Sequence, residues 1–384
     1  MAEALALQGC EVHVITYHLG SQSIDESKLP FKIHRILNVP TYRNCFPGPN
    51  YQKLLVLDFL LLIKVLKFLS KMQIDIIHAH HYEGLLIALA ARKFKRYPII
   101  YDAHTLLSTE LPSYDLGLTN RMKKKLGKYL DEHLPQQADF ILAVSEDLKR
   151  SLLTGGKVLP EKIAVVTNGI EAEFLNVHPR NQSVHIKKIL YAGNLGKFQG
   201  IDCLLKCFRH VLDFRKDVLL NIVTDCSFKP YQSLVDELDI RKYIRLIPSK
   251  LEDLHQHLAD ADILINPRAK CDGISQKLFN YMAVGKPIVS FEGSAKILRH
   301  QENGWIVAGD NHQKLAEAVL HLLENDERCR RIGANARALV KKYSWEMNAI
   351  KAIHIYEKVV SYSTNEKVHS AGSCLASSYQ VPSN

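Results

Sequence analysis

The 384-residue sequence lacks the features that mark secreted, membrane-spanning and nucleic-acid-binding proteins. Its eight cysteines include no Cys-x-x-Cys pair, and no secretory leader is recognisable, so we expect free thiols in the cytoplasm. No uncharged apolar run reaches the roughly 18 residues of a membrane span. The most apolar run, LLVLDFLLLIKVLKFL at 54–69, contains Asp58, Lys64 and Lys67 and predicts a strongly buried helix with a candidate membrane-facing edge.

Two common phosphate-binding signatures are missing as well. The glycine-rich segment GNLGKFQG at 193–200 is not G-x-G-x-x-G and has no Walker lysine-serine pair, so neither a dinucleotide fold nor a P-loop is supported. Aromatic and basic residues do not interleave as they do in nucleic-acid modules, and we therefore expect no nucleic-acid partner.

The sequence does contain a large excess of positive charge, with a net charge of +10, which favours anionic partners. The densest basic cluster lies in NRMKKKLGKYLDEHL at 120–134. On a helix its cations share a face opposite three apolar residues; the cations are Arg121, Lys124, Lys125 and Lys128, and the apolar residues are Met122, Leu126 and Tyr129. Two interpretations stay open: a solvated face, or a peripheral contact with acidic lipid headgroups on the inner membrane face.

Short β-branched runs alternate with helical patterns in two successive sets, which predicts an α/β protein with parallel sheets in two domains. The predicted strands cover 11–16, 75–80, 97–104, 140–145 and 163–168, then 187–193, 218–225, 243–248, 261–267 and 286–292. A polar segment at 176–187 suggests the boundary. We expect domains at 1–180 and 187–342, a last helix at 343–360, and a disordered serine-rich tail at 361–384.

Residues just past the strand ends are the candidate site, because ligands of open parallel sheets gather at the carboxyl edge. In CDGISQKLF, residues 271–279, Gly273 and Ser275 allow close backbone approach at a helix N-terminus, and Lys277 adds a cation where the dipole alone favours an anion. Together with Lys197 in the earlier glycine-rich loop, this pattern suggests a diphosphate site. The alternative is that Ser275 is an ordinary cap and Lys277 is solvated.

Histidines follow two strands of the first set. His78 and His80 share one face of a predicted strand and resemble a metal pair, but no third ligand follows at a useful spacing. Zinc ligands and buried or cleft histidines are the two interpretations, and we assign no metal site. His104 stands at the end of the next predicted strand, where it can transfer a proton, donate to a developing anion or serve a structural role.

Five segments resemble, in order and spacing, the glycosyltransferase group 1 (family 4) enzymes of GT-B fold: FILAVSEDLKRSLL, IAVVTNGI, YAGNLGKFQGIDCLL, LINPRAKCDGISQKLFNYMAVGKPIV and YSWEMNAIKAIHIYEKV. The resemblance implies two Rossmann-like domains facing a cleft. It also implies an enzyme, a retaining hexosyltransferase that moves sugar from a nucleotide-sugar donor, such as a UDP- or GDP-sugar, to an acceptor hydroxyl. No cofactor or metal is implied, and the last helix would cross back onto the first domain.

The same resemblance assigns residues to roles. It implies catalytic roles for His104 and Asp272 and acceptor-side roles for His81 and Glu83. It implies donor binding by Gly193, Asn194, Lys197, Arg268, Gly273, Ile274, Ser275, Lys277, Leu278 and Asn280. The partners would be the nucleotide-sugar donor and a glycan or lipid-linked acceptor, in cell-surface polysaccharide or glycolipid biosynthesis.

The sequence departs from the family pattern in several places. Asp272 and Asn280 stand at the family's paired glutamates, and Asn194 and Gln199 stand where an arginine and a lysine are usual. The chain also opens on a helix, MAEALALQG, where the family has a strand and a glycine-rich loop. We therefore expect that the first strand is missing and that the protein is poorly soluble or inactive. A degenerate nucleotide-binding homologue and a sugar-nucleotide epimerase of the same fold are the alternatives.

Overall fold

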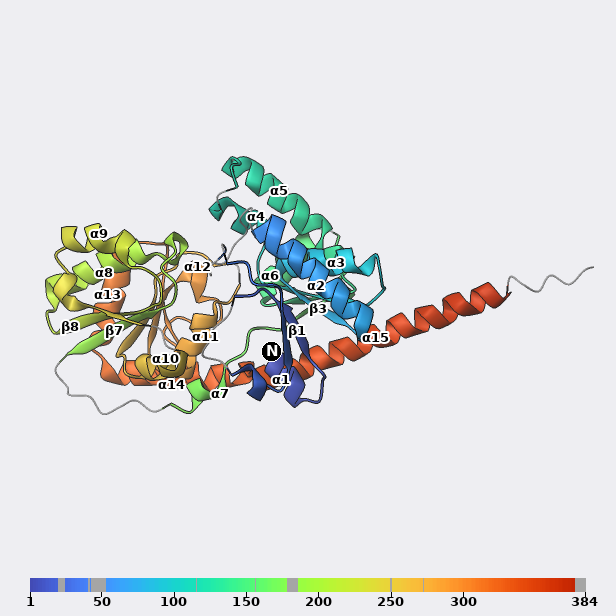
Figure 1. Cartoon of the computed structure of the whole chain (residues 1–384). Coiled ribbons are helices and arrows are strands. Elements are labelled where there is room, and N and C mark those ends of the chain that lie inside the picture. The colour runs from blue at the N-terminus through green and yellow to red at the C-terminus, as the bar shows by residue number, and fades with distance from the viewer. Residues whose placement is uncertain are drawn as a thin grey trace, which may run out of the picture. The chain divides into compact units, whose positions relative to one another are not determined.

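The computed structural model describes residues 1–19, 25–40, 42, 53–114, 116–155, 157–177, 186–248, 251–271 and 273–376. The chain forms two compact units, shown in Figure 1. Unit 1 contains Met1–Thr167 and Asn348–Asn384, and unit 2 contains Asn168–Met347. Most of the polar segment at which the sequence suggests a boundary, 178–185, lies outside the described residues.

Unit 2 is built on a six-stranded parallel sheet of order β12-β11-β10-β7-β8-β9. The strands are β7 (Lys187–Ala192), β8 (Val218–Val223), β9 (Ile244–Ile247), β10 (Ile263–Asn266), β11 (Ile288–Phe291) and β12 (Trp305–Val307). The sequence predicted all of these except β12. Because β7 lies between β8 and β10, the chain leaves β7 in one direction and later returns on its other side, so the loops after β7 and β10 flank a topological switch point.

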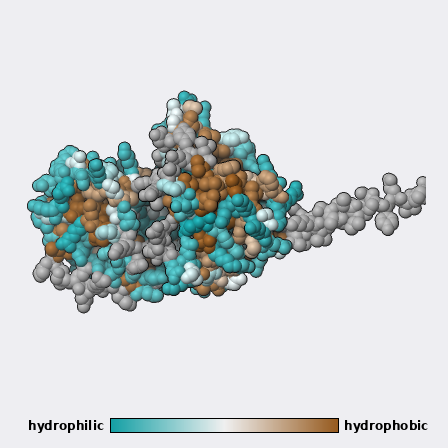
Figure 2. Space-filling view, in the orientation of Figure 1, coloured by the Kyte–Doolittle hydropathy of each residue, from teal (hydrophilic) through white to brown (hydrophobic). Residues whose placement is uncertain are grey.

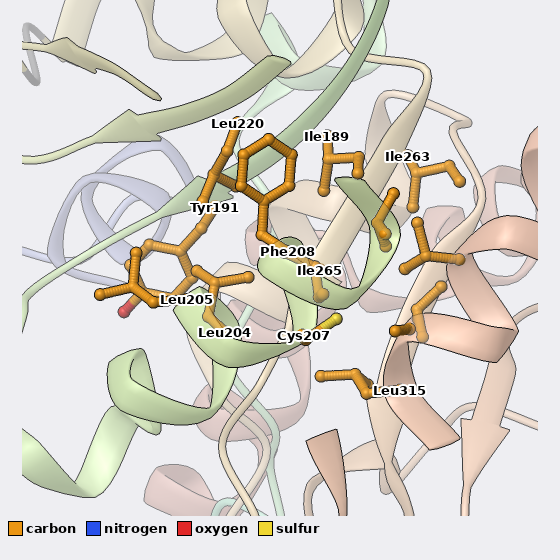
Figure 3. Packing of buried hydrophobic residues seen from close by; sticks show 14 of the residues in the cluster. Ile189, Tyr191, Leu204, Leu205, Cys207, Phe208, Leu220, Ile263, Ile265 and Leu315 are labelled. Carbon is orange, nitrogen blue, oxygen red and sulfur yellow. The ribbon is translucent and has the colours of Figure 1, made fainter. Parts of the chain in front are cut away.

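Side chains of these strands alternate between two cores, as the period of two in a strand requires. Ile189 and Tyr191 pack on one face with α8 (Ile201–Phe214) and α13 (His312–Leu323), and Figure 3 shows part of this cluster. Leu190 and Ala192 pack on the other face. The helices contributing to that second core are α7 (Ala172–Leu175), α10 (Leu251–Ala259), α11 (Gln276–Ala283), α12 (Glu292–Ala295) and α14 (Asp326–Val340). The smaller helix α9 (Gln232–Glu237) packs with the first core.

The described residues of unit 1 form two separate parallel sheets. A two-stranded sheet pairs β1 (His13–Thr16) with β2 (Lys32–Arg35). A four-stranded sheet has the order β3-β4-β5-β6, with β3 at Ile77–His80, β4 at Ile99–Ala103, β5 at Phe140–Ala143 and β6 at Ile163–Val165. All strands except β2 were predicted. The helices are α1 (Ala2–Leu7), α2 (Asp58–Lys71), α3 (His81–Arg92), α4 (Leu107–Glu110), α5 (Asn120–His133) and α6 (Glu146–Thr154).

The apolar run at 54–69 is less buried than predicted. It forms the end of a π-helical turn at Lys53–Leu57 and most of α2, and in α2 only Leu69 is fully buried. Phe59 is 59% exposed, and hydrophobic residues gather over α2 on the face of unit 1 seen in Figure 2. The prediction of a strongly buried helix is therefore wrong: α2 packs against α3 and β1, but most of its residues are only partly buried. No described helix is long and apolar enough to cross a bilayer.

The last helix, α15 (Trp345–Ala376), is longer than the sequence predicted. Its first residues belong to unit 2 and the rest, from Asn348, to unit 1. The extension beyond residue 360 has no apolar stripe, which is the signal on which the predicted helix end depended. Residues 377–384 of the predicted tail lie outside the described residues.

Candidate functional site

The candidate donor site in unit 2 lies at the carboxyl ends of β7 and β10 and at the start of α11. Ser275 is the N-cap of α11, but its side chain makes no capping hydrogen bond within the described residues. Ile274 and Leu278 are buried in the core behind the helix. Only their backbone groups can therefore face a ligand, and the open helix end offers the partial positive charge predicted there.

Lys277 is the cation of this site. Its Nζ donates hydrogen bonds to Tyr191 Oη at 3.0 Å and to Gln199 Oε1 at 2.8 Å, and it lies 4.2 Å from the centre of the Tyr191 ring. No described carboxylate forms an ion pair with it. Burial, with a smaller contribution from the nearby charge of Arg268, lowers the pKa of Lys277 to about 7. A largely enclosed amine with only neutral partners is arranged to receive a negative charge from a ligand.

The glycine-rich loop approaches Lys277 closely. Gly193 has a φ of +138°, and a Cβ there would lie 3.1 Å from Lys277 Nζ. Gly200 has a φ of +75°, and a Cβ there would lie 2.2 Å from the carbonyl oxygen of Pro267, just past β10. Two glycines therefore let the loop after β7 touch both the lysine and the loop after β10. Within the loop, Gly196 N donates to Asn194 Oδ1 at 3.1 Å, which fixes the turn.

The other predicted donor residues lie around these two loops. The guanidinium of Arg268 stacks over Phe198 at 5.1 Å, and Lys197 is exposed in the short helical turn Lys197–Gln199. Asn280 Oδ1 accepts a hydrogen bond from Gln276 Nε2, which also donates to Gly169 O. Gly273 precedes the N-cap. Asp272 lies outside the described residues, so its predicted catalytic role is untested.

A cluster of imidazoles forms around one buried carboxylate in unit 1. Asp102, on β4, is 6% exposed and pairs in register with His80 on β3. Asp102 Oδ2 lies 3.3 Å from His104 Nε2, 3.0 Å from His80 Nδ1 and 3.2 Å from His78 Nε2. Burial alone would raise the pKa of Asp102, but these nitrogens hold it well below its usual value. The carboxylate therefore orients His104 at the end of β4.

The two acceptor-side candidates lie at the start of α3, beside this cluster. His81 has a φ of +58°, an unfavourable conformation for a histidine, and its ring stacks on that of His104 with centroids 4.4 Å apart. Burial and the charge of His104 lower the pKa of His81 to about 4, so this imidazole is neutral at pH 7. Glu83 pairs with Lys53 at 2.6 Å, and Lys53 keeps its pKa low against the opposing effect of burial. The positive φ of His81 is a form of backbone strain, and such strain often accompanies a functional site.

Sequence reasoning missed the partners that position the predicted residues. Tyr191 and Gln199 hold Lys277, and Asp102 and Tyr356 hold the histidines, with Tyr356 Oη 2.5 Å from His78 Nδ1. Gln199 was noted only as a departure from the family pattern. Tyr191 could have been found from the sequence, because it directly precedes Ala192 and Gly193 at the end of a predicted strand. Nothing in the local pattern pointed to Tyr356, which is 278 residues from His78.

Two family profiles match successive parts of the chain. Residues 1–174 match Glycosyltransferase Family 4, and residues 186–325 match Glycosyl transferases group 1. Among characterised relatives, D-inositol 3-phosphate glycosyltransferase of Corynebacterium glutamicum is 23% identical over 78% of this chain and 75% of its own length.

Solved structures agree with these matches at the level of the fold. Sucrose-phosphate synthase from Thermosynechococcus elongatus superposes with a TM-score of 0.77 at 16% identity, covering 94% of this chain and 92% of its own. HepE of Anabaena, in complex with UDP and glucose, gives a TM-score of 0.66 at 17% identity over 86% of each chain. The predicted GT-B fold is confirmed.

Proposed function

Because this chain belongs to the group 1 and family 4 glycosyltransferases, we propose that it is a retaining transferase that moves a sugar from a nucleotide-diphosphate sugar to an acceptor hydroxyl. The observation that carries the proposal is the environment of Lys277, an enclosed cation with neutral partners at a helix N-terminus. A diphosphate supplies the missing negative charge. Each charge-assisted hydrogen bond to a phosphate oxygen contributes about 1.5 to 3 kcal/mol.

The residues of unit 2 give the proposed donor site its parts. Lys277, Arg268 and Lys197 neutralise the diphosphate and stabilise the departing nucleotide, so that no metal ion is needed at the phosphates. The backbone at Gly193 and at the start of α11 lets phosphate oxygens approach. Asn280 takes the ribose hydroxyl and Asp272 the sugar hydroxyls. HepE contains UDP in its solved complex, and a uridine nucleotide is accordingly the first to test here.

The residues of unit 1 serve the acceptor and the reacting sugar. We assign the catalytic proton contact to His104, oriented by Asp102, and acceptor contacts to His81 and Glu83. The acceptor is a glycan or lipid-linked sugar in cell-surface polysaccharide or glycolipid biosynthesis at the cytoplasmic face of a membrane.

The proposal is tested by a thermal-shift screen with UDP, GDP, ADP and the matching nucleotide sugars. One nucleotide series should stabilise the protein, by about 2.7 kcal/mol at a hundredfold excess over the dissociation constant. The Lys277→Ala variant should lose most of this shift. Folded protein that no nucleotide stabilises would contradict the proposal. Stabilisation without donor hydrolysis or transfer would favour the degenerate homologue, and conversion of the sugar without acceptor would favour the epimerase.

The surface of α5 supports a peripheral contact with anionic lipid. The helix packs against its unit through Lys123 and Gly127, and a Cβ at Gly127 would lie 2.5 Å from the Ser108 backbone. The predicted apolar face is therefore turned outward: Met122 is 52%, Leu126 43% and Tyr129 58% exposed. Four exposed cations flank it, namely Arg121, Lys124, Lys125 and Lys128. Exposed apolar residues beside cations fit the boundary between lipid headgroups and acyl chains, where each cation contributes about 1 kcal/mol.

Vesicle sedimentation tests this contact. The protein should bind vesicles of phosphatidylglycerol and phosphatidylcholine, and it should bind pure phosphatidylcholine vesicles weakly. The triple substitution Met122→Ser, Leu126→Ser and Tyr129→Ser should abolish binding. Phe214→Ser, which removes an apolar side chain that is 68% exposed in unit 2, is the matched control and should leave binding unchanged. Equal binding by the triple variant would contradict a role for α5.

A further inference from the structure

His78, His80 and Asp102 place three metal-ligand atoms together in unit 1. One oxygen or nitrogen from each lies within 4.8 Å of the others, and no other group of this kind occurs among the described residues. The sequence offered only the histidine pair, because the third member comes from the neighbouring strand 22 residues after His80. The pairing of β3 with β4 brings Asp102 directly beside His80.

The two distances from Asp102 to the histidines are close to those between ligands of one small cation, and the third, between the histidines, is within 4.8 Å. Zinc bonds of about 2.0 to 2.1 Å in a regular tetrahedron place neighbouring ligand atoms about 3.3 to 3.4 Å apart. Asp102 Oδ2 lies 3.2 Å from His78 Nε2 and 3.0 Å from His80 Nδ1. His104 Nε2 lies 3.3 Å from the same oxygen and 3.4 Å from His80 Nδ1.

Hydrogen bonding alone does not satisfy this arrangement. A carboxylate oxygen has two lone pairs, whereas three imidazole nitrogens converge on Asp102 Oδ2. The Nε2 atom of His78 is buried and, among the described residues, has no hydrogen bond of acceptable geometry. Its other nitrogen contacts Tyr356 Oη, as the second nitrogen of a metal-bound histidine contacts an outer partner.

We propose that His78, His80 and Asp102 bind a divalent transition-metal ion of the zinc class. The donor set of two imidazoles and one carboxylate suits zinc. The side chains of His78 and Asp102 are largely buried, whereas that of His80 is 53% exposed, so an ion can reach the site from the side of His80. A bound ion uses the Asp102 oxygen that His104 contacts and therefore inhibits transfer. This consequence depends on the function proposed above; the binding itself does not.

Metal binding is measured directly, so that its failure is separate from any failure of the proposed transferase. Protein stripped with EDTA and dialysed is titrated with Zn²⁺ in competition with a chromophoric zinc chelator. The wild type should bind one ion in this site. His80→Ala removes an exposed ligand and should weaken that binding at least about tenfold, and Tyr356→Phe should weaken it by a similar or smaller factor.

A matched control comes from the second histidine pair of unit 1. His13 Nδ1 lies 2.9 Å from His34 Nε2, so this pair is the competing place for zinc. His34→Ala should leave the binding unchanged, and circular dichroism should show that each variant is folded. Equal zinc affinity in the wild type and His80→Ala, loss of binding in His34→Ala, or no stoichiometric binding by the wild type would each overturn the proposal.

Discussion

Donor binding should take up a proton at Lys277. In the free protein its pKa is about 7, because burial and the charge of Arg268 disfavour the ammonium form. A bound diphosphate favours that form, so the pKa rises on binding. Between pH 6 and pH 8 the charged fraction of Lys277 in the free protein falls from about 90% to about 10%, and donor affinity should fall about tenfold. Below pH 6 Lys277 should add no further pH dependence.

The sign follows from proton linkage. Between pH 7 and the ordinary lysine pKa of 10.5 the unfolded chain holds the proton that folded, ligand-free Lys277 has lost, so this residue makes stability rise with pH in that range. Donor binding restores the proton and removes that dependence. The phosphates of a nucleotide sugar are diesters that do not titrate between pH 6 and 8, so the effect belongs to the protein.

The assay is isothermal calorimetry with the nucleotide sugar chosen by the thermal-shift screen, at several pH values and in buffers of different ionisation enthalpy. At pH 8 the wild type should take up about 0.9 proton on binding. Lys277→Met should bind more weakly and lose this part of the pH dependence. Lys197→Met, which removes an exposed cation, should bind more weakly at every pH but keep the dependence. A flat wild-type profile, or the same profile in Lys277→Met, would refute the reasoning.

Two further predictions concern the loop and the histidine. Gly200→Ala should destabilise the protein by about 2 kcal/mol or more, because it adds a clash with Pro267 to the strain of a positive φ. Gly309 has a φ of +76° and open space around it, so Gly309→Ala is the control that should show the strain alone. Equal losses of stability in thermal melts of the two variants would rule out the clash. His104→Ala should lower kcat about 10²- to 10⁴-fold while the thermal shift by donor persists, and an unchanged kcat would remove its catalytic assignment.

The strand pattern was predictable because it depends on short-range periodicity. Ten of the twelve described strands were anticipated, and β2 and β12 were missed. Because all strands of a parallel sheet end on the same side, the loops that follow them lie together at the carboxyl edge, where ligands of such sheets bind. Periodicity does not show which face of a helix is buried. On α5 it groups the cations and the apolar residues on different faces, yet the buried residues are Lys123 and Gly127.

The candidate sites were predictable only in part, because their chemistry depends on contacts between distant residues. Lys277 was predicted from its position at a helix start, but its lowered pKa comes from burial beside Tyr191 and Gln199 and from the charge of Arg268. In the sequence, Gln199 stands where the family pattern has a lysine, which suggests weaker binding of the diphosphate. In the fold, however, its amide oxygen accepts a hydrogen bond from Lys277 and holds that amine in place. Because the Lys277 side chain is ordered before the ligand arrives, less conformational entropy is lost on binding.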